Sequence, residues 1–280
     1  MSDVDVVVFG SINEDVTVHL ARMPEAGETV GGRTLRTGCG GKGANQAVAA
    51  ARLGARTAMV GSVGTDPAGQ RQLDALHDAG VDTTGVRLVG AATGTALVLV
   101  DDDGENRIVV VPGANELPPT EGDLVRDAAV LICQLEVPVP VVAAMAAAAS
   151  GFFALNAAPA MAVPSALLAR CDLLVMNETE RDTLGAVAPS GYTAVTLGAA
   201  GALLLRDGRE IARAAAPRVE VVDTIGAGDA FVAALAIALA RGWDPRTALE
   251  AACLVGADAV QHPGARPWLH PLEHYRPSSD

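Results

Sequence analysis

The sequence predicts an α/β protein whose central sheet is mostly parallel and is accompanied by a small antiparallel sheet. Three observations indicate this fold. Short apolar runs rich in β-branched residues recur along the chain, as expected of strands buried on both faces. Helix-like segments lie between most of these runs, which is the pattern of βαβ units with right-handed crossovers. Two further regions alternate apolar and polar residues and contain turn signals, so they predict antiparallel strands outside the main sheet.

The elements of the main sheet are predicted in order from the N-terminus. The first strand is residues 4–9, a run that ends at Gly10. Later strands are expected at residues 57–60, 130–133, 152–155, 173–176, 194–197 and 202–205. Helices are expected at residues 43–53, 67–79, 139–149, 229–240 and 245–260. Because half of the 280 residues are apolar, the chain can bury one large core, and we expect residues 1–280 to form a single domain.

The small sheet is predicted from two insertions, residues 14–37 and 94–111. They contain strand-like pieces such as VTVHL and TALVLV, and the pair Asp103-Gly104 supplies a turn signal in the second. We expect both insertions to build one antiparallel sheet over the carboxyl edge of the main sheet. A sheet in that position would act as a lid.

Composition and charge argue against several classes of function. A net charge of -13 without any basic tract disfavours a nucleic-acid partner or an anionic membrane surface, because phosphate contacts need clustered cations. Residues 1–10 carry acids before a short apolar run, which does not fit a secretory signal. The uncharged stretch 137–169 is interrupted by prolines and polar residues, so we expect no membrane span there.

The cysteines are widely spaced and form no C-x-x-C pair. They are Cys39, Cys133, Cys171 and Cys253. This spacing does not fit a zinc site and favours a reduced, cytoplasmic compartment.

The segment VDTIGAGDAF at residues 222–231 is the most specific motif. A Gly-Ala-Gly turn that enters a helix exposes backbone N–H groups at the positive end of the helix dipole, where a phosphate binds well. Asp229 stands at the start of that helix, and its ordinary interpretation is an N-cap. An N-cap requires neither the glycines nor the second acid, Asp223. A carboxylate beside an anion hole fits phosphoryl transfer to an alcohol, in which an aspartate accepts the hydroxyl proton as the bond forms.

Several segments match the signatures of one known family in order and spacing. They are GSINED at 10–15, GGKGANQAVAAARLGA at 40–55, NETE at 177–180, TLGAAG at 196–201 and DTIGAGDAF at 223–231. Over nearly its whole length the chain resembles the ribokinase-like (pfkB) carbohydrate kinases. This resemblance implies a ribokinase-like three-layer α/β/α sandwich with a β lid. It also implies an ATP-dependent kinase that phosphorylates the primary hydroxyl of a small sugar, D-ribose in the first place.

The resemblance implies roles at the reaction centre and in the sugar site. Asp229 would be the catalytic base, and the anion hole would be the backbone of Ile225, Gly226, Ala227 and Gly228. The sugar would be held by Asn13, Asp15, Gly41, Lys42, Asn45 and Glu136. Their carboxylates, amides and close backbone suit vicinal hydroxyls. Taken singly, these polar residues have ordinary alternatives as turn residues, a helix cap or a solvated loop acid.

ATP and the ions would be bound further along the chain. By the resemblance, the nucleotide residues are Asn177, Glu180, Thr196, Leu197, Gly198 and Gly201. The spacing of Asn177 and Glu180 places them on one face of a helical turn, from which Glu180 would reach Mg²⁺ through water. The alternative is that NETE is only a helix-capping segment. A K⁺ activator would be bound, mostly by backbone carbonyls, at Asp223, Ile225, Ala259, His262 and Gly264.

Three features depart from the family pattern. Trp268 stands where members of the family have a serine near the cation. Only fifteen residues separate Glu180 from Thr196, so one crossover is expected to be shortened. Cys253 occupies a position near the adenine where relatives often have histidine or asparagine. The resemblance further implies a homodimer formed through the lid.

Three rival functions stay open from the sequence. One is a kinase for another sugar or a nucleoside, such as 2-deoxyribose, fructose or adenosine. The second is a sugar- or nucleotide-binding relative without catalysis. The third is a dinucleotide-dependent oxidoreductase, which rests on the glycines of TGCGGKGANQAV at 37–48. That loop does not directly follow the first strand and lacks the acid expected after the second, so it is interpreted as the floor of the sugar site.

Overall fold

A nine-stranded sheet forms the centre of the molecule, in the order β13-β12-β11-β10-β9-β8-β1-β4-β5. The computed structural model describes residues 5–103, 105–120, 123–185, 187 and 189–277. The strands are β1 Val6–Phe9, β4 Thr57–Gly64, β5 Asp82–Val89, β8 Val130–Cys133, β9 Phe152–Asn156, β10 Leu173–Asn177, β11 Tyr192–Thr196, β12 Ala202–Arg206 and β13 Arg209–Ala214. Pairs from β5 to β11 are parallel, whereas β12 and β13 are antiparallel additions. The predicted mostly parallel sheet is therefore confirmed.

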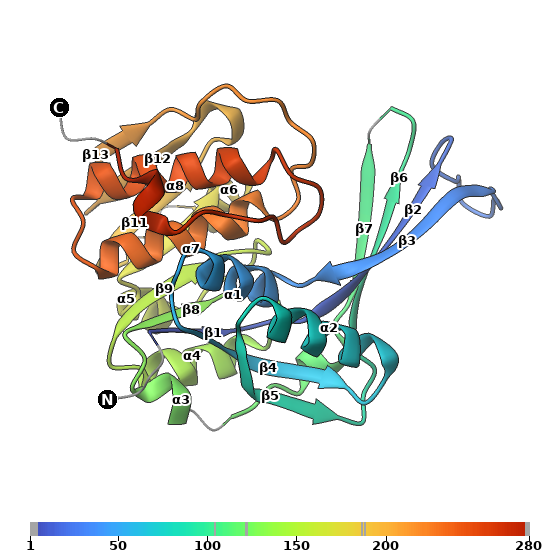
Figure 1. Cartoon of the computed structure of the whole chain (residues 1–280), viewed down its shortest axis with the longest axis horizontal. Coiled ribbons are helices and arrows are strands. Elements are labelled where there is room, and N and C mark those ends of the chain that lie inside the picture. Colours follow the sequence, from blue (N-terminus) through green and yellow to red (C-terminus); the bar gives the residue numbers. More distant parts are fainter. Residues whose placement is uncertain (1–4, 104, 121–122, 186, 188, 278–280) are drawn as a thin grey trace.

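Helices cover both faces of this sheet (Figure 1). They are α1 Lys42–Arg52, α2 Pro67–Asp78, α3 Asp123–Arg126, α4 Val139–Ala148, α5 Ser165–Arg170, α6 Glu178–Leu184, α7 Ala227–Ala240 and α8 Pro245–Ala259. Short 3₁₀ segments lie at Gly113–Glu116, Gly198–Ala200 and Leu272–Tyr275. Alternation along β1 separates two cores: Val6 and Val8 pack toward α1, α7 and α8, while Val7 and Phe9 pack toward α4. The three layers agree with the expected α/β/α sandwich.

A four-stranded sheet projects from this body, in the order β3-β2-β6-β7 (Figure 1). Its strands are β2 Asn13–Leu20, β3 Gly32–Gly40, β6 Gly94–Val100 and β7 Asn106–Val111. The pairs β2–β3 and β6–β7 are antiparallel as expected, but the central pair β2–β6 is parallel. The reason is that each insertion folds as its own hairpin, and the two hairpins join through their outgoing strands. Gly104 of the predicted turn lies outside the described residues.

Several boundaries differ from the predictions. The strand expected at 194–197 is β11, Tyr192–Thr196, so Leu197 lies beyond it. The edge strands β5 and β13 were not expected, because their mixed burial gives neither a continuous apolar run nor a clean alternation. The connection from β10 to β11 contains one short helix, α6, as the expected shortened crossover requires. Residues 186 and 188 of that connection lie outside the described residues. Within the described ranges, no helix is both long and apolar enough to cross a bilayer.

Candidate active site

A cavity of about 230 Å³ lies at the carboxyl end of the parallel strands, where the start of α7 faces α1 and α6. Its lining residues are Lys42, Asn156, Ala158, Val175, Met176, Asn177, Glu180, Thr196, Thr224, Gly226, Gly228, Asp229 and Val232. Residues predicted separately for the sugar, the phosphate and the nucleotide thus share one cavity. Such a cavity at the carboxyl edge of an open parallel sheet is the usual ligand site of this fold class.

The start of α7 has the geometry of an anion site. Gly226 has φ 79°, and a Cβ atom there would lie 2.1 Å from the carbonyl oxygen of Ala265, so only glycine fits. The first i→i−4 bond runs from the Ala230 N–H to the Gly226 carbonyl at 2.9 Å. The N–H groups of Gly228 and Asp229 therefore precede the helical ladder, at the positive end of the dipole and beside the cavity.

Asp229 is the third residue of α7 and not its N-cap. Its side chain is 9% exposed and accepts two hydrogen bonds from α1: Asn45 Nδ2 donates to Oδ2 at 3.1 Å, and Gln46 Nε2 donates to Oδ1 at 2.9 Å. Burial raises the pKa of Asp229, while Lys42 and the two amides oppose that rise. The N-cap alternative is therefore wrong for this carboxylate.

Lys42 supplies the positive charge of the site. Burial alone would lower its pKa, but Asp229, Glu136, Glu180 and Asp15 outweigh the burial, and the pKa rises. The ammonium group is therefore charged at neutral pH. It lines the cavity between the start of α7 and the start of α6, where it can face both an incoming hydroxyl and a phosphate.

Glu136 is not a solvated loop acid. Its Oε2 accepts hydrogen bonds from Ser11 Oγ at 2.5 Å and from the Lys42 N–H at 3.2 Å. It therefore fixes the N-terminus of α1 to the loop after β1. Gly41 precedes α1 with φ 88°, and a Cβ there would lie 2.6 Å from the backbone nitrogen of Asn13. The close approach of these two loops explains the glycine at this position.

Asn13 and Asp15 lie at the start of β2. Asn13 is 2% exposed, and its Oδ1 accepts a bond from Asn115 Nδ2 at 2.6 Å. Asp15 packs so closely on Gly40 that a Cβ there would lie 2.1 Å from its Oδ1. Burial raises the pKa of Asp15 to about 6, with Arg266 opposing the rise. Both side chains are thus held by tertiary contacts and are not turn residues of an exposed loop.

Asn45 is the fourth residue of α1 and does not cap it. Its Nδ2 donates to Asp229, and its Oδ1 accepts from Arg266 Nε at 3.1 Å. Arg266 also donates through Nη2 to the Gly40 carbonyl at 3.0 Å and to Gln72 Oε1 at 2.8 Å. One guanidinium therefore joins the C-terminal loop, the end of β3 and the predicted sugar site.

Asn177 and Glu180 form a capping box at the start of α6. Glu180 N–H donates to Asn177 Oδ1 at 2.8 Å, and Asn177 N–H donates to Glu180 Oε2 at 2.8 Å. The capping interpretation is confirmed, yet both residues also line the cavity. Burial raises the pKa of Glu180, which the bond from Asn177 and the charge of Lys42 oppose.

The remaining residues predicted for the nucleotide follow β11. Thr196 ends that strand and lines the cavity, whereas Leu197, Gly198 and Gly201 lie in the 3₁₀ turn between β11 and β12 and do not line it. Gly198 and Gly201 have φ 56° and 98°. The structure thus brings only the first of these four residues to the cavity wall.

The segments predicted to bind K⁺ lie side by side. The Val222 and Asp223 N–H groups donate to the Val260 carbonyl, and the Asp223 carboxylate accepts from the Ile225 and Gly264 N–H groups at 3.0 and 2.9 Å. The Ala259 carbonyl accepts the His262 N–H at 3.2 Å. Elsewhere in this loop, the Trp268 ring packs edge-on against His270, with centroids 4.3 Å apart. The segment before α7 and the loop after α8 are thus joined by several hydrogen bonds.

Several residues of the site were missed by the sequence analysis. They are Ser11, Gln46, Asn115, Gln134, Asn156 and Arg266. A usable signal existed for Gln46, which is fully buried within the apolar run of α1. Arg266 and Gln134 gave no local signal, because their partners Asn45 and Gln46 lie 221 and 88 residues away.

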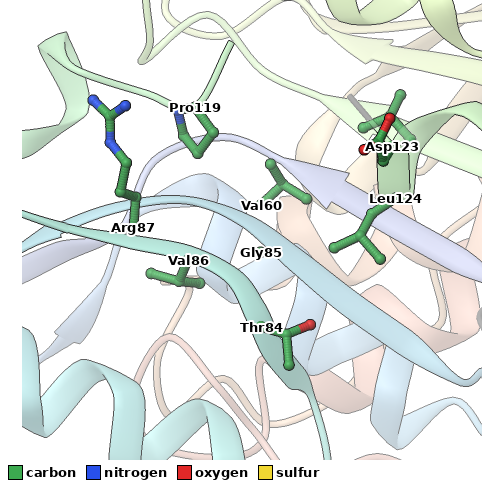
Figure 2. A pocket seen from close by; sticks show the side chains of 9 residues that line it. Val60, Thr84, Gly85, Val86, Arg87, Pro119, Asp123 and Leu124 are labelled. Carbon is green, nitrogen blue, oxygen red and sulfur yellow. The ribbon is translucent and has the colours of Figure 1, made fainter. Parts of the chain in front are cut away.

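A second cavity, of about 330 Å³, lies between the edge strand β5 and α3 (Figure 2). Its wall includes Val60, Thr84, Arg87, Asp123 and Leu124. None of its lining residues is among those predicted to hold sugar, nucleotide or cation. The cavity at the start of α7 is instead the one lined by residues that the sequence predicted for the site.

Comparison with known proteins found similar sequences and structures. Residues 3–270 match the family model described as "pfkB family carbohydrate kinase". A ribokinase of Arabidopsis thaliana is 34% identical over 292 aligned positions, which cover 93% of this chain and 77% of that protein. A deoxyribokinase of Salmonella typhi is 32% identical over 298 positions, which cover 97% of each chain. A solved structure of Arabidopsis thaliana ribokinase complexed with ribose and ATP superposes with a TM-score of 0.88 at 33% identity, over 97% of both chains.

Proposed function

The chain belongs to the pfkB family of carbohydrate kinases, and we propose that it transfers the γ-phosphoryl group of ATP to the primary hydroxyl of D-ribose. The products would be D-ribose 5-phosphate and ADP. In this proposal residues 1–280 form one kinase domain, and the β2, β3, β6 and β7 sheet is its lid.

The observation that carries the proposal is the position of Asp229. Its carboxylate is buried at the start of α7, beside the N–H groups that precede the helical hydrogen-bond ladder, in a cavity that Lys42 and Glu180 also line. In the reaction the sugar hydroxyl gives its proton to Asp229 while its oxygen bonds to the γ-phosphorus of ATP, and the bond from that phosphorus to the bridging oxygen breaks so that ADP leaves. The backbone N–H groups of Gly226 and Gly228 would bind the transferred group, whereas the Ala227 N–H already donates to the Thr224 carbonyl at 3.4 Å. Lys42 would neutralise charge that develops on the transferred group. The lid would close over the sugar and exclude water.

Sugar selection is proposed to depend on the base of the lid. Amide and carboxylate side chains gather around Gly40 and Gly41: Asp15 packs on Gly40, and the backbone of Asn13 and of Asn45 contacts Gly41. Such a set of polar groups suits a small ring with several hydroxyls. The similarity to a deoxyribokinase makes 2-deoxyribose the specific rival. A panel of ribose, 2-deoxyribose, fructose and adenosine with Mg-ATP tests the proposal. We expect the highest kcat/KM with ribose, and a higher value with any other acceptor would overturn the substrate assignment.

Two ions complete the proposed site. The residues fit Mg²⁺ held through water, because Glu180 engages the Asn177 N–H through Oε2 and keeps its other oxygen for a hydrated cation. Mg²⁺ would supply neutralisation of the nucleotide phosphates. The residues also fit K⁺, since the Asp223 to Ile225 and Ala259 to Gly264 segments are joined by hydrogen bonds. Kinase activity measured with K⁺ replaced by tetramethylammonium tests the proposed K⁺ site. Activity that does not change on this replacement would contradict a K⁺ activator.

We further propose a homodimer that forms through the lid. β7 is an edge strand, and its residues Ile108, Val109, Val110 and Val111 are 57, 60, 46 and 51% exposed. An exposed apolar edge strand of this kind is normally covered by a partner. All four cysteines are unpaired, which fits a reducing compartment such as the cytoplasm.

A further inference from the structure

Two consecutive amides of α1 hold the two oxygens of the Asp229 carboxylate. Asn45 Nδ2 lies 3.1 Å from Oδ2, and Gln46 Nε2 lies 2.9 Å from Oδ1. A carboxylate with one donor on each oxygen cannot rotate about its terminal bond without losing both bonds. The direction of its remaining lone pairs is therefore fixed before any substrate binds.

An amide can present either its NH₂ group or its oxygen, and only the NH₂ group can donate to a carboxylate. If either amide turned over, its oxygen would face the Asp229 oxygen, and the contact would become repulsive. The carboxylate is thus held only as long as something else fixes the orientation of each amide.

Both amides have a contact on their oxygen that sets their orientation. Arg266 Nε donates to Asn45 Oδ1 at 3.1 Å, and a guanidinium has only donors, so the Asn45 oxygen must face it. Gln134 Nε2 donates to Gln46 Oε1 at 2.6 Å. Each amide therefore accepts a hydrogen bond on its oxygen, from Arg266 or Gln134, and donates one through its nitrogen to Asp229.

The two outer residues are themselves held in place. Arg266 is anchored through Nη2 to the Gly40 carbonyl and to Gln72. Gln134 is fully buried and packs on Gly10, where a Cβ atom would lie 1.8 Å from Gln134 Oε1. That oxygen has no hydrogen-bond partner among the described residues, so packing alone holds this end of the Gln134 amide. The space for the Gln134 amide exists because residue 10 is a glycine.

We propose that Gln134 and Arg266 are positioning residues that act through Gln46 and Asn45 to orient the carboxylate of Asp229 for proton acceptance. The inference rests on the proposed kinase function. It adds two residues that do not line the cavity and that are distant in sequence from the Gly-Ala-Gly-Asp segment.

The chain of contacts from Gln134 through Gln46 to Asp229 can be tested without changing any charge, because both glutamines are neutral. Asp229 is faced by charged groups from several elements: Lys42 on α1, Glu136 after β8, Asp15 on β2 and Arg266 in the C-terminal loop. Substitutions of Gln46 and Gln134 leave all of them unchanged, whereas a substitution of Arg266 would alter the field at Asp15 as well.

The experiment compares Gln46→Met, Gln134→Met, the double variant and the control Gln70→Met. Gln70 lies exposed on α2, where its Nε2 donates to Asp74 Oδ1 at 2.8 Å. The readouts are kcat and KM for ribose across pH, and the pKa of the Asp229 carboxyl group. That pKa is measured by following the ¹³C NMR chemical shift of the carboxyl carbon as the pH changes. Circular dichroism melts show that each variant is folded.

Loss of a donor to the carboxylate raises the pKa of Asp229, so the acidic limb of the kcat profile should move to higher pH. We expect a shift of about one pH unit in Gln46→Met, a smaller shift in Gln134→Met, and in the double variant the same shift as in Gln46→Met. We expect kcat to fall roughly ten- to a hundredfold while KM for ribose changes little. Gln70→Met should match the wild type.

The inference would be overturned if Gln134→Met matched Gln70→Met in both pKa and pH profile. It would also be overturned if the effects of Gln46→Met and Gln134→Met added in the double variant, because Gln134 would then act by another route. The NMR titration needs no turnover. A wild type without sugar kinase activity would refute the proposed function, while the titration would still decide whether Gln134 controls Asp229.

Discussion

The carboxylate of Asp223 accepts a hydrogen bond from the backbone N–H of Gly264 at 2.9 Å, across 41 residues of sequence. Its other oxygen accepts the Ile225 N–H at 3.0 Å. The two bonds clamp the turn that precedes α7 to the loop that follows α8. This clamp joins the proposed anion hole to the proposed K⁺ site.

Asp223→Ala removes that clamp, so we expect the turn before α7 to lose its fixed shape. The kcat/KM for ATP should fall by roughly tenfold or more, and the concentration of K⁺ needed for half-maximal activation should rise. Steady-state kinetics over a K⁺ series measure both. The control Asp182→Ala removes an exposed acid that pairs with Arg181 and should leave both values unchanged. Equal K⁺ dependence in Asp223→Ala and wild type would contradict the clamp.

Gly226→Ala should disrupt the anion hole. An alanine at φ 79° carries backbone strain of about 1–2 kcal/mol, and its Cβ would also meet the Ala265 carbonyl at 2.1 Å. Gly208→Ala carries similar strain at φ 72° but meets no atom within 4 Å. We expect both variants to lose stability in urea unfolding, and only Gly226→Ala to lose most kinase activity. Full activity of Gly226→Ala would be incompatible with this role.

Asp15→Asn should stabilise the fold at neutral pH. Burial raises the pKa of Asp15 from 3.8 to about 6, so the folded state keeps its proton to higher pH than the unfolded chain. The unfolding free energy therefore falls as pH rises from 3.8 to about 6 and stays lower above that window. Removing the charge should raise the unfolding free energy by at most about 3 kcal/mol at pH 7.5. Below pH 3.8 it should leave the unfolding free energy unchanged.

Urea unfolding of wild type and Asp15→Asn across this pH range measures the difference. The same variant should bind ribose more weakly, because an amide replaces a carboxylate acceptor. A destabilised Asp15→Asn at pH 7.5 would show that the ionised carboxylate gains more from its neighbours than burial costs it.

Val109→Glu should prevent the proposed homodimer. The substitution places a charge on the exposed apolar edge strand β7, where burial in an interface would desolvate it. Ile211→Glu makes a similar change on β13, which is the edge of the main sheet and is 42% exposed at this residue. Sedimentation velocity should show a dimer for wild type and Ile211→Glu and a monomer for Val109→Glu. A dimer of unchanged affinity in Val109→Glu would exclude β7 from the interface.

The sequence was sufficient for the buried parts of the fold. β1, β8, β9 and β10 were located almost to the residue, because burial on both faces gives a short apolar run with turn residues at its ends. β5 and β13 were not located, because an edge strand needs apolar residues on only part of its surface. The parallel pair β2–β6 could not be predicted either, since local pattern does not specify which hairpin strands meet.

The candidate site divides in the same way. Asp229 and Gly226 were identified because a glycine turn before a helix has a local signature. Gln134 and Arg266 were not, because their function depends on contacts made only after the chain has folded. Their residue types alone gave no indication, since a glutamine or an arginine near a strand or loop end is ordinarily a surface residue.

The most direct test of the proposed mechanism is the kcat of Asp229→Asn with ribose and Mg-ATP, together with ribose affinity by calorimetry. The substitution removes the proton acceptor but keeps the size of the side chain that Asn45 and Gln46 contact. We predict that kcat falls by several orders of magnitude, roughly a thousandfold or more, while ribose still binds. A kcat within tenfold of the wild type would show that Asp229 is not the base.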